Sequence, residues 1–479
     1  MKKYGKFIVL LLVLAFLCDA SAQQPQRGDR QRQNLGPNAQ TFPLEEFSIQ
    51  NDESTNKIYA LRYGQYAPTS NKPDEKVKAY PELKSDKPVY GSFTLDEGVF
   101  PSNPLGPTYC FVIDESQGPG TGYDRFYLDL KNDFDLTNDR PAQPVPSSTP
   151  KRNSSLISSL VQNVVEAVRP QNIQRPTEIT FETLTITLAA SRAGRAATPT
   201  EIKLIPRFMR YNDDVTNVSF VPAAARRGKI KIGPTEFDVY LARSPNITTS
   251  FNNPNTGLYL GEDYEMYGVL GKIRKIEGQL YLFSAARDGS QLIVAPYEGE
   301  YGALQIGNIA EQLKNAKFAG GQLLTRSALI DLKDCPADGD KIKIPVGDYA
   351  PMSLEFVSDT LGTSFSQADP DADAPYSLKI TADKPYIFDF SHKPKVVFAE
   401  PDDLAQLKPG EQLSVSALMH VPDLNLQMMG LDDRTQPMKT GIILSDGAEY
   451  IRYPSLDHPI IKITNAAGKV VAQGAMPFG

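Results

Sequence analysis

The chain has 479 residues and a net charge of −7 at pH 7, with 50 lysine and arginine against 57 aspartate and glutamate residues. This length allows about three domains with cores of their own, and an acidic chain without a basic run is a poor candidate for nucleic-acid or anionic-membrane binding. There are three histidines, none at zinc-ligand spacing, and no tryptophan, which disfavours a zinc enzyme and a sugar-cleaving site built on a tryptophan platform.

Residues 1–22 have the pattern of a secretory signal peptide. Three lysines within the first six residues precede an apolar run over 7–17 that is too short to span a bilayer, and the small residues 20–22 (ASA) follow it. Leu17 stands before Cys18, where a lipoprotein signal requires a small residue, so ordinary secretion is favoured. We expect cleavage before Gln23, a secreted, periplasmic or cell-surface location, and no membrane span after cleavage.

Residues 23–42 are polar and rich in Gln, Arg and Pro, which predicts a disordered leader. Residues 43–140 alternate between apolar and polar side chains in short runs that end at Gly, Pro and Asp clusters, and this pattern predicts an antiparallel β domain. The predicted strands of this domain include 57–63, 89–95, 109–113 and 125–130.

A proline- and serine-rich linker is predicted over 141–153, followed by a domain over 154–306. That domain opens with a helix, because apolar residues between Leu156 and Val168 fall on one stripe before Pro170. It continues with strands and with a hairpin that turns at Arg287-Asp-Gly-Ser. This strand-and-turn unit occurs once in the chain, which excludes the repeat of a β-propeller.

The rest of the chain predicts two further units. Residues 307–392 form a β domain that begins with a short helix over 309–318, ended by two glycines. Residues 393–479 form an immunoglobulin-like sandwich that closes with a hairpin, 460–464 against 469–472. The fold class is therefore mainly β, with tandem antiparallel β-sandwich or meander domains and two short helices.

Three phrases of the sequence carry a resemblance to a known group of proteins. FYLDLKNDFDLTNDRP (126–141), KIPVGDYAP (343–351) and ITNAAGKVVAQGAMPFG (463–479) resemble segments of uncharacterised secreted proteins of planctomycete-type bacteria. The resemblance implies export and a string of β-sandwich units. It implies no activity, because the group has none assigned.

The best candidate for a chemical site is a loop with alternate acidic residues, Asp129, Asp133, Asp135 and Asp139. Calcium takes six to eight oxygen ligands, which such a loop can supply. In the EF-hand register that begins at Asp129, however, Lys131 and Arg140 occupy ligand positions. The alternative is a turn whose Asp side chains accept hydrogen bonds from their own backbone. A second acidic loop, Asp369 to Asp373, has the same two interpretations.

No catalytic constellation stands out in the sequence. There is no Gly-x-Ser-x-Gly elbow and no glycine-rich phosphate loop, and His392 and His420 are expected to be a turn residue and a packed strand residue. Cys110 and Cys335 are far apart in sequence, which favours two buried free thiols over a disulfide.

These patterns favour an exported, non-catalytic binding or structural protein of the cell envelope or extracellular space, with a protein or glycan partner. Two alternatives remain. One is a secreted hydrolase that acts on polysaccharide or peptide through two facing carboxylates. The other is a calcium-stabilised adhesin, for which a chelator would lower the melting temperature.

Overall fold

The structure is a computed structural model and describes most of the chain in segments. The described residues are 37–49, 61, 64–97, 106–145, 177–188, 200–210, 216–244, 246–261, 268–309, 315–367, 378–390, 395–400, 416–421, 424, 426–443, 449–456 and 460–475. The predicted signal peptide and the predicted helix after residue 154 lie outside them. Within this part of the chain the fold is almost entirely antiparallel β-structure, as predicted, and the one helical element with a label is the 3₁₀ turn η3 (Leu136–Asn138).

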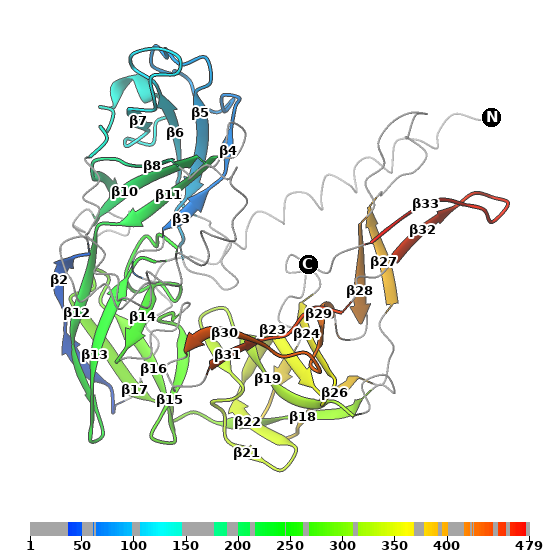
Figure 1. Cartoon of the computed structure of the whole chain (residues 1–479). Coiled ribbons are helices and arrows are strands. Elements are labelled where there is room, and N and C mark those ends of the chain that lie inside the picture. Colours follow the sequence, from blue (N-terminus) through cyan, green and yellow to red (C-terminus); the bar gives the residue numbers. More distant parts are fainter. Residues whose placement is uncertain are drawn as a thin grey trace, which may run out of the picture.

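Two sheets face each other as a β-sandwich at one end of the molecule (Figure 1). The first sheet is β4 (Thr69–Ser70), β5 (Val89–Thr94), β6 (Thr108–Asp114) and β7 (Arg125–Leu128). The second is β3 (Gln65–Ala67), β11 (Thr216–Pro222), β10 (Thr200–Arg210) and β8 (Thr177–Thr180), with β9 (Leu184–Leu188) also paired to β10.

A shared aromatic core holds this sandwich together. Phe220 of β11 lies with its ring centroid 4.0 Å from that of Phe93 on β5, and it also contacts the rings of Phe111 and Phe126. All four side chains are at most 3% exposed. The two sheets therefore bury one continuous core, although they come from sequence segments on both sides of the predicted linker.

Two further sheets form the middle of the molecule. A four-stranded sheet contains β14 (Gly257–Leu260), β13 (Thr235–Ala242), β12 (Ala224–Ile232) and β2 (Glu45–Ser48). A twelve-stranded sheet follows the order β1 (Gln40–Pro43), β17 (Gln291–Pro296), β16 (Gln279–Ala285), β15 (Lys272–Ile276), β20 (Leu329–Asp331), β19 (Lys317–Leu324), β23 (Gly347–Val357), β24 (Leu361–Gln367), β29 (Leu426–Asp433), β28 (Ser416–Val421) and β27 (Lys395–Glu400), with β25 (Leu378–Ile380) paired to β23.

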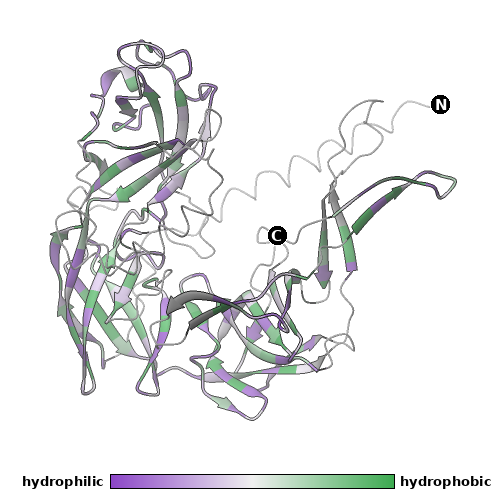
Figure 2. Ribbon diagram, in the orientation of Figure 1, coloured by the Kyte–Doolittle hydropathy of each residue, from purple (hydrophilic) through white to green (hydrophobic). Residues whose placement is uncertain are grey.

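The remaining strands form smaller sheets. One has the order β21 (Ala337–Asp338), β22 (Lys341–Pro345), β18 (Tyr301–Ile309) and β26 (Tyr386–Phe390), and two hairpins are β30 (Met438–Ile443) with β31 (Glu449–Arg452) and β32 (Ile460–Thr464) with β33 (Val470–Ala475). Hydrophobic and hydrophilic residues are interspersed along the strands (Figure 2), as expected for sheets with one buried face. The hairpins predicted at 287–290 and at 465–468 are confirmed.

The predicted helix over 309–318 is wrong at both ends. Ile309 is the last residue of β18, which pairs with β22 and β26, and Lys317 and Phe318 begin β19, which pairs with β23. The apolar spacing of this segment fits a helix, but pairing with strands far away in sequence overrides local propensity. Residues 310–314 lie outside the described part.

Strand pairing in the structure also crosses the predicted segment boundaries. Gln40 to Pro43, placed mostly in the leader, pair with β17. Ala142, placed in the linker, is 2% exposed and forms a bridge with Phe126. Strand β29, placed in the immunoglobulin-like unit, pairs with β24, so the described residues of 393–479 do not form a sandwich of their own.

Glu115, at the end of β6, holds the glycine-rich loop that follows it. Its carboxylate accepts hydrogen bonds from the Ser85 hydroxyl at 2.7 Å and from the backbone N–H groups of Gly120 and Gly122 at 3.1 and 2.9 Å. Burial acts to raise the pKa of Glu115, but these hydrogen bonds outweigh it and hold the pKa below its ordinary value.

We expect Glu115→Gln to destabilise the protein by about 1–2 kcal/mol at neutral pH, because a loop amide loses its charged acceptor. A pKa that is lower in the native than in the unfolded state stabilises the fold above the unfolded-state pKa, about 4.3, and this contribution is lost as the pH falls through the native value. Urea unfolding of both proteins between pH 7 and pH 3 measures the difference. A difference that stays constant over this range would contradict the role of the Glu115 charge.

Candidate functional site

The predicted calcium loop is closed by hydrogen bonds to its own backbone. Asp129, fully buried after β7, accepts from the N–H of Asp133 at 3.0 Å and from the N–H of Phe134 at 2.9 Å, one with each carboxylate oxygen. Asp139 accepts from the N–H of Leu130 at 3.0 Å, and burial raises the pKa of its carboxyl. The buried Asp129 and the half-buried Asp139 carboxylates thus both accept hydrogen bonds from the backbone of the turn.

The other two aspartates of this loop, Asp133 and Asp135, are half-buried and also accept hydrogen bonds from the loop. Asp133 accepts from the N–H of Asp135 and from the Asn138 amide, and the Asn138 hydrogen bond is the main reason that the pKa of Asp133 is lowered. Asp135 caps η3 through the N–H of Thr137. Among the described residues no group of three or more His, Cys, Asp or Glu is placed to share a metal ion, and calcium binding by this loop stays a prediction.

The other predicted candidates contribute no site in the described residues. His420 lies in β28, and its Nε2 is buried without a hydrogen-bond partner. His392, His458 and the acidic loop 369–373 lie outside the described part of the chain. Cys110 and Cys335 are both free and buried, as predicted, and burial raises the pKa of each thiol.

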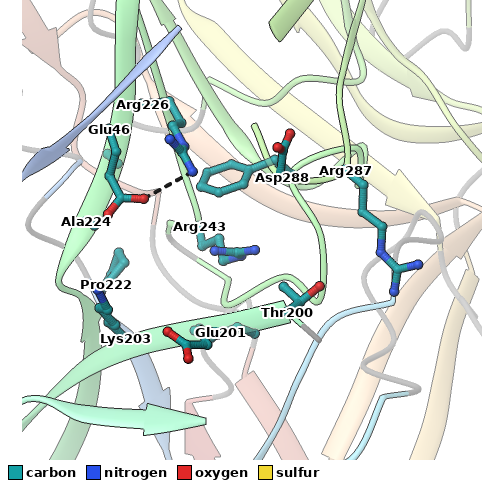
Figure 3. A pocket seen from close by; sticks show the side chains of 13 residues that line it. Glu46, Thr200, Glu201, Lys203, Pro222, Ala224, Arg226, Arg243, Arg287 and Asp288 are labelled. Carbon is teal, nitrogen blue, oxygen red and sulfur yellow. Dashed lines mark ion pairs between the residues drawn. The ribbon is translucent and has the colours of Figure 1, made fainter. Parts of the chain in front are cut away.

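A pocket of about 730 Å³ lies where three sheets meet (Figure 3). At Ala223 the chain leaves β11 and enters β12, so it passes from the sandwich into the middle sheet. The pocket occupies this fork, and the turn between β16 and β17 forms its far wall. Its lining residues are Glu46, Thr200, Glu201, Ile202, Lys203, Pro222, Ala224, Ala225, Arg226, Arg243, Phe251, Arg287 and Asp288.

Arg243 lies in the middle of this pocket in Figure 3, directly after the end of β13. It follows β13, in which Val239 and Leu241 are fully buried, and it lies two residues after Leu241 on the same face. The Arg243 residue is only 8% exposed. A guanidinium at this position is therefore largely removed from water.

The Arg243 guanidinium has an aromatic contact but no ionic partner. Its carbon lies 4.1 Å from the centroid of the Phe251 ring, a cation–π distance, and its buried Nε has no hydrogen-bond acceptor. Among the described residues no carboxylate forms an ion pair with it. Burial first, and the positive charge of Arg226 second, lower the pKa of Arg243 to about 10, so the side chain remains a cation at neutral pH.

Arg226 shares the aromatic ring but has a partner. Its guanidinium lies 5.8 Å from the Phe251 centroid and forms an ion pair with Glu46 at 3.1 Å, which is drawn in Figure 3. The two cations therefore differ. Glu46 forms an ion pair with Arg226, whereas the described residues give Arg243 no ion pair.

Phe251 is held in place by a network of buried polar groups. The Asp96 carboxylate accepts from the side-chain amides of Asn253 at 3.1 Å and Asn255 at 2.7 Å, which anchors the loop that carries Phe251. The Phe251 N–H donates to the carbonyl of Arg287 at 3.1 Å, so the loop is also tied to the β16–β17 turn. The aromatic wall behind Arg243 is thus fixed from two sides.

Gly289 lets this turn approach the pocket. Its φ of +74° suits the turn, and a Cβ added there would lie 2.7 Å from Phe251 and 2.9 Å from the Arg226 side chain. The Asp-Gly pair that predicts the hairpin therefore also allows the hairpin to close one wall.

The sequence pattern predicts the turn 287–290, which contains Arg287, but it marks none of Lys203, Arg226 and Arg243 as a site residue. A signal for Arg243 is present in the run DVYLARS, where the inward positions of a buried strand continue into an arginine. The lack of a partner, which sets Arg243 apart, depends on the fold and leaves no trace in the sequence.

Comparison with known proteins gives no relative: no family model, no curated protein and no solved structure matches the chain. In the part of the chain that the structure describes, no helix has the length and apolar character needed to cross a membrane.

Proposed function

We propose that the chain is an exported binding protein whose ligand presents an anionic group to Arg243. Export rests on the signal pattern of residues 1–22. The observation that carries the binding function is a buried guanidinium in cation–π contact with Phe251, to which the described residues give no ion pair.

Burial of an unpaired charge lowers the free energy of unfolding, which supports this proposal. Proteins usually pair such charges or remove them from the interior. Here the cation lines a pocket large enough for a small ligand, and the Asp96 network keeps the pocket's aromatic wall fixed. A bound anion would supply the missing partner, and its hydrogen bonds to the guanidinium would be charge-assisted.

The test is the thermal stability of the mature chain in acetate, phosphate or sulfate, at an ionic strength held constant with sodium chloride. A ligand at a hundredfold excess over its Kd stabilises the native state by about 2.7 kcal/mol. We expect at least one of these anions to stabilise the wild-type protein and not Arg243→Met. Arg140→Met is the matched control, since it removes an arginine that is 82% exposed. Equal responses of the wild-type protein and Arg243→Met would contradict the proposal.

Export is tested separately. When the full chain is produced in a secreting host, N-terminal sequencing of the exported protein should begin at Gln23. An intracellular product that retains residues 1–22 would contradict export and leave the anion site unaffected.

A further inference from the structure

We propose that the anionic group is the C-terminal carboxylate of a peptide, and that the last residues of this peptide lie against the open edge of β10 at Thr200–Lys203. This inference rests on the proposed function and names its ligand class. Three observations carry it: the charge balance of the pocket, the geometry of the stacked guanidinium and the strand edge that lines the same pocket.

The charge balance of the pocket favours a monoanion. Its lining contains four cationic side chains and three carboxylates, which leaves one positive charge. Arg226 is already paired with Glu46, and Arg243 is the buried cation of the lining to which the described residues give no ion pair. A carboxylate matches this single charge. The second negative charge of a phosphate dianion would be repelled by the three carboxylates of the lining.

The stacked guanidinium favours a planar group. The Arg243 guanidinium carbon lies 4.1 Å from the centroid of the Phe251 ring, and the N–H donors of a guanidinium all lie in the plane of the group. A planar arrangement of donors matches the two oxygens of a carboxylate in a bidentate pair.

The edge of β10 is open at Thr200–Ile202 because the chain leaves its partner β11 at Ala223 and continues into β12. The Ala223 N–H donates to the Lys203 carbonyl at 2.9 Å, and beyond this bond the chain turns away into β12. Main-chain groups alternate in direction along a strand, so the N–H and C=O of Glu201 point to the same side as those of Lys203. The other side of this stretch is paired with β9. Among the described strands, none pairs with Thr200–Ile202 on the pocket side.

An extended peptide fits this combination of groups. Its terminal carboxylate would meet Arg243, and a peptide amide near its end would pair with the main chain of Glu201, as in strand addition to a sheet edge. Glu46, Glu201 and Asp288 also line the pocket. We therefore expect a basic side chain near the peptide's C-terminus to bind better than an acidic one.

The test compares acetylated hexapeptides that have a lysine before the last residue, by fluorescence polarisation with the mature protein. One form has a free C-terminal carboxylate, the second has a C-terminal amide, the third is N-methylated at its last amide and the fourth has glutamate in place of lysine. We expect the free acid to bind at least tenfold more tightly than each of the other three.

Variants of the protein test the same contacts. Arg243→Met and Arg243→Lys are both expected to lower the affinity for the free-acid peptide at least tenfold. Arg243→Lys has this effect because lysine keeps the charge but lacks the planar set of donors. Glu46→Gln is expected to tighten the binding of acetate, which carries no basic group, severalfold, because it releases Arg226. Arg140→Met should have no effect.

The outcomes separate the inference from the proposed function. Equal affinity for the free acid and the amide would refute recognition of the C-terminal carboxylate. An unchanged affinity on N-methylation would refute pairing of the peptide with the edge of β10. If acetate or a uronic-acid disaccharide stabilises the protein through Arg243 while no peptide binds, the anion site stands and the peptide ligand is wrong. If no anion binds, both fail.

Discussion

Arg243→Met is expected to make the ligand-free protein more stable than the wild type, by about 1–2 kcal/mol. Arg243 is buried and charged, and the described residues offer it no ion pair, so its desolvation is not compensated within the fold. Replacing buried charges by apolar residues of similar volume is often neutral or stabilising, even when the charges are paired. A methionine would keep the contact with Phe251 and remove the unpaired charge. Urea unfolding of the mature chain in sodium chloride measures the effect.

The matched control for this prediction is again Arg140→Met, which is expected to change the free energy of unfolding by less than about 0.5 kcal/mol. A loss of more than about 1 kcal/mol in Arg243→Met would contradict the account. It would show that Arg243 stabilises the fold, and a ligand would then not be needed to explain its burial.

Phe220→Ala is expected to destabilise the sandwich by about 3–5 kcal/mol, the usual cost of removing a buried aromatic ring. The Phe220 ring is fully buried and contacts Phe93 at 4.0 Å between centroids, Phe111 at 5.7 Å and Phe126 at 5.8 Å. Because these partners lie on β5, β6 and β7, the loss affects both sheets at once. Tyr66→Ala, on β3 of the same sheet and 58% exposed, should have little effect.

Limited proteolysis identifies which segments Phe220→Ala loosens. Cleavage rates should rise together in β5–β7 and in β10–β11, because these strands share one core. If cleavage rose in β10–β11 alone, the segments before and after residue 140 would be separate domains, as the sequence pattern suggests, and the shared core would be refuted.

The elements of this fold are predictable where the pattern is local. Alternation over 89–95 and 125–130 predicts β5 and β7, and turn chemistry predicts the hairpins at 287–290 and 465–468. The partners of these strands are not predictable in the same way. β3 pairs with β11, β1 with β17 and β24 with β29, over separations that no local pattern encodes.

This limit explains the errors in the predicted segments. The abundance of proline and serine predicts a linker at 141–153, but Ala142 is buried and forms a bridge with Phe126. The apolar spacing predicts a helix over 309–318, but β18 and β19 extend into its two ends because they pair with other strands. Composition and periodicity describe a segment by itself, whereas β pairing depends on a second segment.

The candidate site shows the same limit more strongly. The acidic run from Asp129 to Asp139 is conspicuous in sequence, yet the Asp129 and Asp139 carboxylates accept backbone N–H groups of their own loop. Arg243 is inconspicuous in sequence and becomes unusual only in the fold, where it is buried against Phe251 without an acceptor. What distinguishes a binding residue here is an interaction that the protein itself does not complete.

The most direct test of the account is the NMR signal of the Arg243 Nε–H group, assigned through its loss in Arg243→Met and followed during a titration with sodium acetate. If Arg243 binds anions, this signal shifts in a saturable way with acetate, and sodium chloride at the same ionic strength leaves it in place. If the Arg243 signal does not move while the signals of exposed arginines respond equally to both salts, Arg243 holds no anion and the proposed binding site is wrong.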